Sequence, residues 1–250
     1  MTSQSQELKS APDKADESPL ASLRAAYSEK RRDYFECSRP EVLKFFPKGA
    51  KRVLDVGCSS GNFGESVKVT QNCEVWGVEP DAESAKAASS RLDRAFAGFF
   101  GEEIGLPEGY FDCICFNDVL EHMVDPAAAL KYAAKLLTKD GRILASIPNI
   151  RHFPTVWRLA VRGTWDYTER GILDKTHLRF FTANSIVRFF ETEGFVVDQM
   201  EGINEFADMI SGDTRLWKIY RLLSLWPTRA LREMKYLQFV VVARRKSSTA

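Results

Sequence analysis

The stretch 52–64 constrains the fold of this chain more than any other segment, because an apolar run ends there in an acidic, glycine-containing turn. Residues 52–56 alternate as a buried strand does, and helical spacing begins at Asn62. Small residues in the turn let the backbone approach a ligand, and the helix that follows offers unpaired amide donors. The segment therefore predicts a ligand site at the carboxyl end of a strand.

Three features of this turn narrow the class of ligand. A dinucleotide fingerprint requires glycine at positions 57, 59 and 62, but the chain carries Ser59 and Asn62. A phosphate-binding P-loop is also excluded, because no Gly-Lys-Ser/Thr follows. The carboxylate of Asp55 disfavours a pyrophosphate and favours a ligand that carries an ammonium or sulfonium group.

A second acidic residue follows the next predicted strand. Residues 74–79 read as a strand that ends at Glu79, and an acid about 20 positions after the first turn accepts hydrogen bonds from ribose hydroxyls in nucleotide-binding folds. Taken singly, Asp55 could cap a helix and Glu79 could be a solvated loop acid. Their occurrence together, before the strand-like segments 111–117 and 141–149, favours a nucleoside site.

These segments, in this order, resemble motif I and the later motifs of the class I S-adenosylmethionine-dependent methyltransferases. The resemblance implies S-adenosyl-L-methionine as cofactor and a Rossmann-like, doubly wound α/β fold. Its seven-stranded sheet would be mostly parallel, with an antiparallel last strand. It also implies cofactor-binding roles for residues around the methionine moiety, the ribose and the adenine, namely Asp55, Gly57, Cys58, Gly61, Asn117, Glu79 and Glu102.

The alternation of strand and helix patterns predicts a parallel sheet covered by helices on both faces. Strands are expected at 52–56, 74–79, 95–100, 111–116 and 141–147, with helices at 62–70, 81–92 and 126–138. A helix at 182–193, capped by Thr182, precedes strands at 195–201 and 237–243. All the candidate ligand residues lie at carboxyl ends of strands, where open α/β sheets bind ligands.

The chain is expected to form one catalytic domain over residues 20–250. Residues 1–19 are polar and predict a disordered tail. Residues 20–46 predict two leading helices interrupted by Pro40, residues 150–182 an acceptor-side loop region, and residues 203–236 a helical insert before the last strand.

Charge and cysteine content limit the possible partners and ligands. The net charge is only +1, and no RNA-binding motif is evident, so a nucleic-acid partner is not expected. The basic segment 213–236 predicts an amphipathic helix that packs on the domain, or instead contacts a membrane surface or a second copy of the chain. Five cysteines without metal-ligand spacing predict no metal site and a cytoplasmic protein, with peripheral contact at the inner membrane as an alternative.

The chain contains three histidines that offer acid–base chemistry. His177 lies beyond the fifth strand, and Asp174 precedes it by three residues, so the pair is predicted to act as a base and its orienting carboxylate. The alternative is that both residues brace the next helix. His152 is also predicted to face the pocket, and His122 to be structural.

The string 173–182, Leu-Asp-Lys-Thr-His-Leu-Arg-Phe-Phe-Thr, resembles a bacterial subgroup of these methyltransferases that is linked with glycan assembly. This resemblance implies O-methylation of a sugar or a related hydroxyl of a small-molecule or glycan acceptor. One alternative is O- or C-methylation of a lipidic or aromatic small molecule, such as a quinone or polyketide precursor. Another is a non-catalytic subunit that only binds the cofactor.

Overall fold

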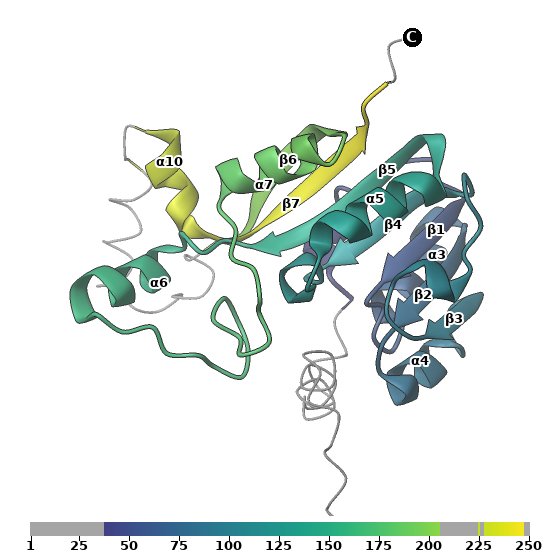
Figure 1. The fold of residues 1–250 in the computed structure, drawn as a ribbon, viewed down its shortest axis with the longest axis horizontal. Coiled ribbons are helices and arrows are strands. Elements are labelled where there is room, and N and C mark those ends of the chain that lie inside the picture. The colour runs from purple at the N-terminus through teal and green to yellow at the C-terminus, as the bar shows by residue number, and fades with distance from the viewer. Residues whose placement is uncertain (1–37, 206–224, 226–227, 248–250) are drawn as a thin grey trace, which may run out of the picture.

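The computed structural model describes residues 38–205, 225 and 228–247, which form a single seven-stranded sheet flanked by helices (Figure 1). The strand order is β3-β2-β1-β4-β5-β7-β6. Strands β1 to β5 pair in parallel, whereas β7 runs antiparallel to both β5 and β6. The predicted mostly parallel sheet with an antiparallel last strand is therefore confirmed. The strands are β1 (Arg52–Val56), β2 (Glu74–Glu79), β3 (Arg94–Ala97), β4 (Phe111–Asn117), β5 (Leu137–Pro148), β6 (Phe195–Glu205) and β7 (Tyr236–Arg245).

The longer described helices are α3 (Asn62–Gln71), α4 (Ala82–Ala88), α5 (Pro126–Leu136) and α7 (Ala183–Thr192). Shorter ones are α2 (Pro40–Leu43), α6 (Phe153–Trp157) and α10 (Arg229–Arg232). Figure 1 shows α6 and the chain that follows it extending away from the strands β1 to β3, on the side of the molecule where β7 begins. The acceptor-side loop region predicted at 150–182 thus begins beyond the carboxyl end of β5.

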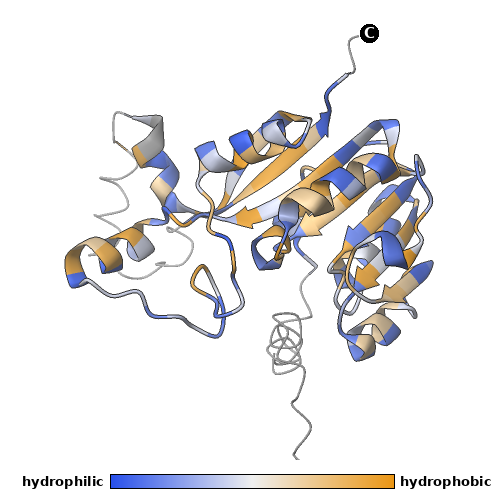
Figure 2. Cartoon of the chain, in the orientation of Figure 1, coloured by the Kyte–Doolittle hydropathy of each residue, from blue (hydrophilic) through white to orange (hydrophobic). Residues whose placement is uncertain are grey.

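Two hydrophobic cores lie on opposite faces of the sheet, whose strands are largely hydrophobic in the colouring of Figure 2. Successive residues of a strand point to opposite faces, so Leu54 packs in the core under α5 and α7, while Val53 packs in the core under α2, α3 and α4. Cys113 and Cys115 belong to the second core, with their Sγ atoms 3.8 Å apart. Both thiols are fully buried, which confirms that they serve as small core residues.

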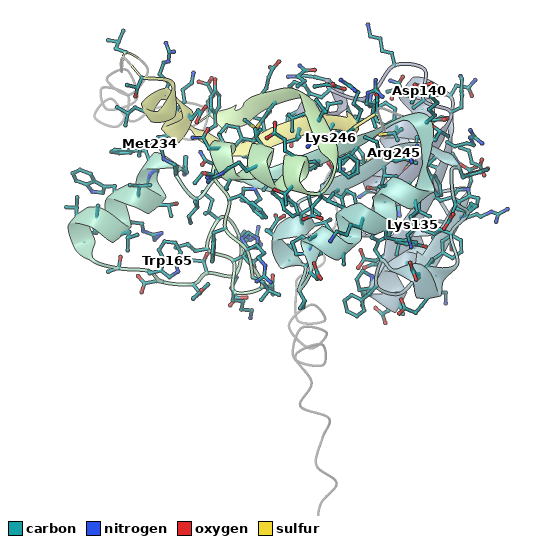
Figure 3. All side chains as sticks on the ribbon, turned by 45° about the horizontal axis from the view of Figure 1, so that its top comes forward. Lys135, Asp140, Trp165, Met234, Arg245 and Lys246 are labelled. Atoms are coloured by element: carbon teal, nitrogen blue, oxygen red, sulfur yellow. The ribbon has the colours of Figure 1, made fainter. Side chains whose placement is uncertain are left out.

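Specific hydrogen bonds stabilise the start of α7 and the end of α5. The hydroxyl of Thr182 accepts from the backbone N–H of Ser185 at 3.2 Å, which confirms the predicted cap of α7. At the other end of the sheet, the Arg245 guanidinium donates to the carbonyls of Ala134 and Thr138 (Figure 3). A cation there satisfies the Ala134 carbonyl, which lies in the last turn of α5, and opposes the negative end of the helix dipole, while the Thr138 carbonyl belongs to β5.

The structure corrects several predicted boundaries. Pro40 occupies the first position of α2 and begins that helix, because proline lacks an N–H that the first turn does not use. Helix α4 ends at Ala88 and α5 at Leu136, and β5 begins at Leu137, four residues before the predicted start.

The predicted helical insert 203–236 is also too long at both ends. Pairing of β6 with β7 continues from Phe195 opposite Arg245 to Glu205 opposite Tyr236. Residues 203–205 and Tyr236 are therefore strand residues. The predicted tail 1–19, the leading segment 20–37 and most of the amphipathic segment lie outside the described residues.

No helix among the described residues is long and apolar enough to cross a bilayer.

Candidate functional site

A cavity of about 810 Å³ lies at the carboxyl ends of β1, β2 and β4. Its lining comes from the turns after these strands, from the loop after β3 and from the first part of α5. The lining includes six of the residues predicted to bind the cofactor, Asp55, Gly57, Cys58, Glu79, Glu102 and Asn117. The cavity is thus where parallel α/β sheets place their ligands.

Asp55 is an ionisable group buried in the wall of this cavity. Its side chain is 2% exposed, and its Oδ2 atom has no hydrogen-bond partner among the described residues. Burial, and then the nearby charge of Glu79, raise the pKa of Asp55 to about 8. A cationic ligand beside this carboxylate would offset both effects, since an opposite charge favours the ionised form.

Glu79 is held in a fixed orientation at the end of β2. Its Oε2 accepts from the backbone N–H of Ser59 at 2.9 Å, and its Oε1 accepts from that of Asp81 at 3.0 Å. Burial raises the pKa of Glu79, although both hydrogen bonds act in the opposite direction. Each carboxylate oxygen has a second lone pair, so the geometry fits an acceptor for a pair of ligand hydroxyls.

Asn117 ends β4 and carries an amide whose oxygen and nitrogen are both buried without a hydrogen-bond partner among the described residues. Buried polar groups in folded proteins nearly always have partners, so such an amide indicates a ligand contact. The side chain lines the same cavity as Asp55. Together they offer a carboxylate, a donor and an acceptor to one polar ligand.

The far end of the cavity is aromatic. The ring of Phe100 packs edge-on against Phe116, with centroids 5.6 Å apart, and lies 5.1 Å from the ring of Tyr132. Glu102, the predicted adenine-side acid, is 71% exposed and forms an ion pair of 2.7 Å with Lys135. This pairing lowers the pKa of Glu102, which lies at the rim of the cavity.

The small residues of the turn after β1 serve different purposes. Gly57 has a φ of +68°, and a Cβ there would approach Val119 Cγ2 to 2.6 Å. Gly61 has a φ of +86°, lies outside the cavity lining and packs against the backbone of Ala88 in α4. Cys58 lines the cavity, and its burial raises the pKa of its thiol.

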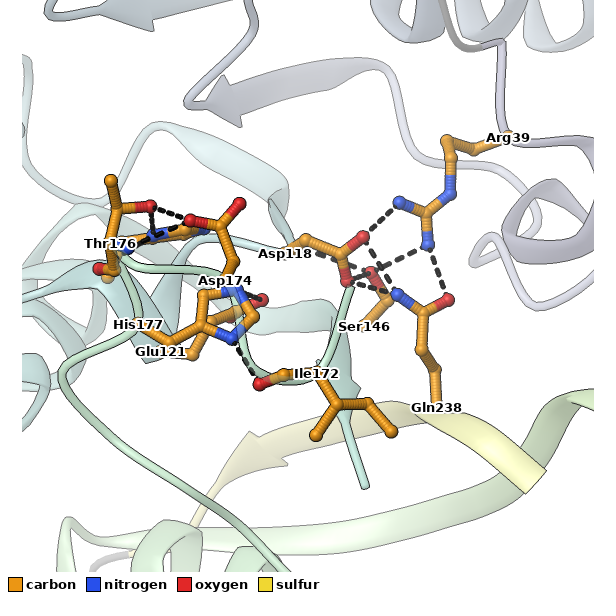
Figure 4. Close-up of polar contacts among 10 residues, drawn as sticks. Arg39, Asp118, Glu121, Ser146, Ile172, Asp174, Thr176, His177 and Gln238 are labelled. Atoms are coloured by element: carbon orange, nitrogen blue, oxygen red, sulfur yellow. Dashed lines mark hydrogen bonds and ion pairs between the residues drawn. The ribbon is translucent and has the colours of Figure 1, made fainter. Parts of the chain in front are cut away.

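A polar network joins four distant segments beside the cavity (Figure 4). The guanidinium of Arg39 forms an ion pair with Asp118 and donates to Ser146 Oγ and Gln238 Oε1, both at 3.2 Å. The Gln238 amide donates to both oxygens of Asp118, at 2.8 and 2.9 Å. Asp118 has a φ of +54°, a left-handed conformation that the network holds in place. Sequence reasoning missed this network, because its members are isolated polar residues in unrelated elements.

The three residues predicted to be catalytic, His177, Asp174 and His152, lie outside the cavity lining. The Nδ1 atom of His177 is 2.9 Å from the carbonyl oxygen of Ile172, and its Nε2 is 3.9 Å from Glu121 Oε1. His152 is buried at the start of α6, and burial lowers its pKa to about 4. At neutral pH the imidazole of His152 is therefore uncharged and a weak base.

The histidine that does line the cavity is His122, which the sequence indicated as structural. Its ring packs edge-on against that of His177, with centroids 4.5 Å apart. One side-chain nitrogen or carboxylate oxygen from each of Glu121, His122 and His177 lies within 4.8 Å of the other two. The signal in the sequence was a Glu-His pair immediately beyond the end of β4, where ligand-facing loops converge.

Comparison with known proteins places these features in context. The family profile described as "Methyltransferase domain" matches residues 27–200. A ubiquinone biosynthesis O-methyltransferase of Bradyrhizobium diazoefficiens is 29% identical over 169 residues, which cover 64% of this chain and 65% of that protein. The enzyme of the same name from Aeromonas salmonicida is 27% identical over 163 residues, covering 62% of this chain and 66% of the relative. The similarity thus spans slightly less than two thirds of these relatives.

Solved structures agree with the fold. A SAM dependent methyltransferase from Archaeoglobus fulgidus superposes with a TM-score of 0.61 at 16% identity, covering 86% of this chain and 95% of its own. The 1,6-didemethyltoxoflavin-N1-methyltransferase of Burkholderia thailandensis, solved with its substrate and S-adenosylhomocysteine, gives a TM-score of 0.60 at 17% identity. That match covers 96% of this chain and 94% of the other. At such identities the likeness concerns the fold alone.

Proposed function

Because this chain belongs to the methyltransferase-domain family, we propose that it is an enzyme that methylates a hydroxyl group of a small-molecule acceptor. Its cofactor is S-adenosyl-L-methionine, as the family and the fold indicate. When bound, this cofactor supplies a methyl group activated by a positively charged sulfur. The observation that carries the proposal is that one cavity holds buried polar atoms of Asp55 and Asn117 for which the described part of the chain supplies no hydrogen-bond partner.

The residues around the cavity fit the parts of such a cofactor. Asp55 would face its cationic end, since a buried carboxylate is the group that gains most from a positive neighbour. Glu79 would accept from the ribose hydroxyls, and the Phe100 ring would cover the adenine. Asn117 would hold the methionine moiety with an amide that has no protein partner among the described residues.

A phenolic ring hydroxyl, as in quinone precursors, is the acceptor class that we place first. The relatives named above are ubiquinone biosynthesis O-methyltransferases. A sugar hydroxyl is the second class, and the string 173–182 favours it through its resemblance to methyltransferases of glycan assembly. Both classes need removal of a hydroxyl proton as the oxygen attacks, so they share one mechanism.

The acid–base group for this reaction belongs, in our proposal, to the region where the loop 171–182 meets the loop after β4. His177 and Asp174 come from the first loop, and Glu121 and His122 from the second. The backbone N–H groups of Leu178 and Arg179 donate to the carbonyl oxygen of Glu121, at 2.8 and 3.0 Å. These hydrogen bonds hold the two loops against each other beside the cavity.

Radiolabelled methyl transfer tests the proposal directly. Wild-type protein is offered labelled S-adenosylmethionine with simple catechols in one series and nucleotide sugars in the other. We expect label in a catechol methyl ether, and label in a sugar would select the second acceptor class. Calorimetry with S-adenosylmethionine and S-adenosylhomocysteine runs in parallel. Cofactor binding without transfer to either series would favour a non-catalytic subunit, and absence of binding would refute the proposal.

A further inference from the structure

We infer that His122 is the base that takes the acceptor's proton, and that Thr176 and Asp174 are positioning residues that fix its protonation pattern. This inference rests on the proposed O-methylation. It starts from a buried chain of hydrogen bonds that connects the carboxylate of Asp174, the hydroxyl of Thr176 and the imidazole of His122. Only the last of these three side chains lines the cavity.

The contacts in the chain are short and shielded from water. Thr176 Oγ1 lies 2.6 Å from Asp174 Oδ1 and 3.0 Å from His122 Nδ1. The backbone N–H of Thr176 also donates to Asp174 Oδ1, at 2.8 Å. The three residues are 1%, 2% and 3% exposed in the order Asp174, Thr176 and His122. Charge-assisted hydrogen bonds in such surroundings are strong and hold one geometry.

The donors and acceptors in this chain fix the tautomer of His122. An ionised carboxylate only accepts, so the single hydroxyl proton of Thr176 is donated to Asp174. Thr176 Oγ1 then accepts from His122 Nδ1, and the Thr176 carbonyl oxygen, 3.1 Å from the same nitrogen, can also only accept. Nδ1 therefore carries the proton. In the neutral ring Nε2 then bears the lone pair, which is the form required of a base.

His122 forms part of the cavity wall, in which its Nε2 atom is buried. It follows β4 by five residues and shares the cavity wall with Asn117 and Asp118. Its neighbour His177 packs against the ring and is in turn near Glu121. His177 lies outside the lining, so it would support the position of His122 and not contact the acceptor.

The proposed step is a balanced proton and methyl transfer. The acceptor O–H bond breaks and its proton moves to Nε2 of His122. An oxygen electron pair forms the new bond to the methyl carbon, and the electron pair of the sulfur–carbon bond remains on sulfur. One positive charge thus passes from the sulfonium to the imidazolium, and the proton later leaves to solvent. The carboxylate of Asp174, linked to the ring through Thr176, and the nearby carboxylate of Glu121 stabilise that charge.

Two charged residues of the loops that meet at this site also belong to the cavity wall. Arg170, from the loop that carries Asp174, and Asp118, from the loop that carries His122, also line the cavity. A guanidinium near the acceptor favours its ionised oxygen, which acts in the same direction as the base.

Two variants at Thr176 separate positioning from folding. Thr176→Val removes the hydroxyl with little change in shape, and Thr176→Ser retains it. Nitrogen-15 NMR of the imidazoles in the full-length protein reports which nitrogen of His122 is protonated, independently of any acceptor. We expect the Nδ1–H form in wild type and Thr176→Ser, and a weaker preference for it in Thr176→Val, where only the backbone carbonyl oxygen of residue 176 remains to accept from Nδ1. An Nε2–H form in wild type would overturn the inference.

Activity with a catechol acceptor supplies the second readout. We expect His122→Gln to lower kcat about a hundredfold or more, Thr176→Val about tenfold, and Thr176→Ser less than threefold, with the affinity for S-adenosylmethionine unchanged within twofold. Thr70→Val, at an exposed position of α3, is the matched control. Full kcat in His122→Gln would refute His122 as the base. Loss of wild-type activity on chelation, with recovery on adding Mg²⁺, would also refute it and indicate a metal at this cluster.

The experiments distinguish a failure of the proposed O-methylation from a failure of His122 as its base. If wild type methylates no hydroxyl acceptor, the proposed function fails, and the tautomer measurement still decides whether the chain from Asp174 orients His122. If wild type methylates a catechol while His122→Gln does so equally well, the proposed function stands and the assignment of the base falls.

Discussion

Following the proposed roles, the part of the cavity lined by Asp55, Glu79 and Asn117 is its cofactor half, and the part lined by Arg39, Asp118 and His122, with the residues that hold them, is its acceptor half. The two halves are built in different ways. In the cofactor half, Asp55, Glu79 and Asn117 each lie at or next to the last position of their own strand. In the acceptor half, Arg39 meets Gln238 across 199 positions of sequence, and Asp174 reaches His122 through Thr176. The first half thus follows from local patterns of single strands, and the second only from how distant segments converge.

The largest effect is expected from Glu79→Ala in the cofactor half. This change removes an acceptor for ligand hydroxyls and also frees the N–H groups of Ser59 and Asp81. Loss of hydrogen bonds to a charged group weakens binding by about 3 kcal/mol, or roughly a hundredfold. Calorimetric titration with S-adenosylmethionine measures it.

The matched control is Glu83→Ala, which removes an exposed acid from the first turn of the adjacent helix α4. Its affinity for the cofactor should equal that of wild type. If Glu79→Ala bound S-adenosylmethionine as tightly as Glu83→Ala does, the ribose role of Glu79 would be wrong.

The next effect concerns stability in the acceptor half. Arg39→Met removes the cation that Asp118 shares with Gln238, and leaves a partly buried carboxylate with fewer partners. We expect a loss of about 2 kcal/mol in the free energy of unfolding. The remaining carboxylate stays partly buried, and the cost of removing it from water is no longer offset by a cation. Urea denaturation measures it, and Arg52→Met, at a more exposed ion pair, is the control.

Arg39→Met also tests whether the polar network affects acceptor binding more than cofactor binding. Cofactor affinity should change less than threefold, while the KM for the acceptor rises. Equal weakening of cofactor and acceptor binding would show that the network serves the whole cavity.

The difference between local and long-range construction explains which parts of the fold and of the site could be predicted from the sequence. The strands from β1 to β5 and the residues Asp55 and Glu79 were predictable, because hydrophobic alternation and an acid at a strand end are local signals. The start of β5 was placed too late, because residues 138–140 are polar and the strand begins with a single residue, Leu137, that pairs with Phe111 of β4 before the register shifts. The role of His122 was missed, since its partners Thr176 and Asp174 lie more than fifty positions away. Tertiary convergence leaves no periodic pattern in a sequence.

A third, smaller effect is a proton linkage at Asp55. Its pKa of about 8 means that the free protein holds a proton there at pH 7. A cationic cofactor favours the ionised form, so binding should release a proton below pH 8. Affinity for S-adenosylmethionine should therefore fall as the pH falls from 8 to 6, by at most about tenfold per pH unit.

Asp55→Asn isolates this linkage, because the titration of the ligand itself is common to both proteins. The variant should bind the cofactor with a weaker pH dependence and release fewer protons, as calorimetry in buffers of different ionisation enthalpy reports. It should also be more stable than wild type at pH 8. A raised folded-state pKa means that unfolding releases a proton between about pH 4 and 8, so wild type loses stability as the pH rises through that range. A pH dependence of binding identical to wild type would place the cationic group of the ligand elsewhere.

The smallest effect is expected at the rim of the cofactor half, where Glu102 forms a largely exposed ion pair with Lys135. Ion pairs in this setting are screened by water and salt and contribute little. Lys135→Ala should therefore change the affinity for S-adenosylmethionine by less than about twofold, as should Lys86→Ala on exposed α4. A tenfold gain or loss only in Lys135→Ala would mean that Lys135 governs how Glu102 meets the adenine. The rim would then belong to the binding site, and the cofactor half would depend on a tertiary contact as the acceptor half does.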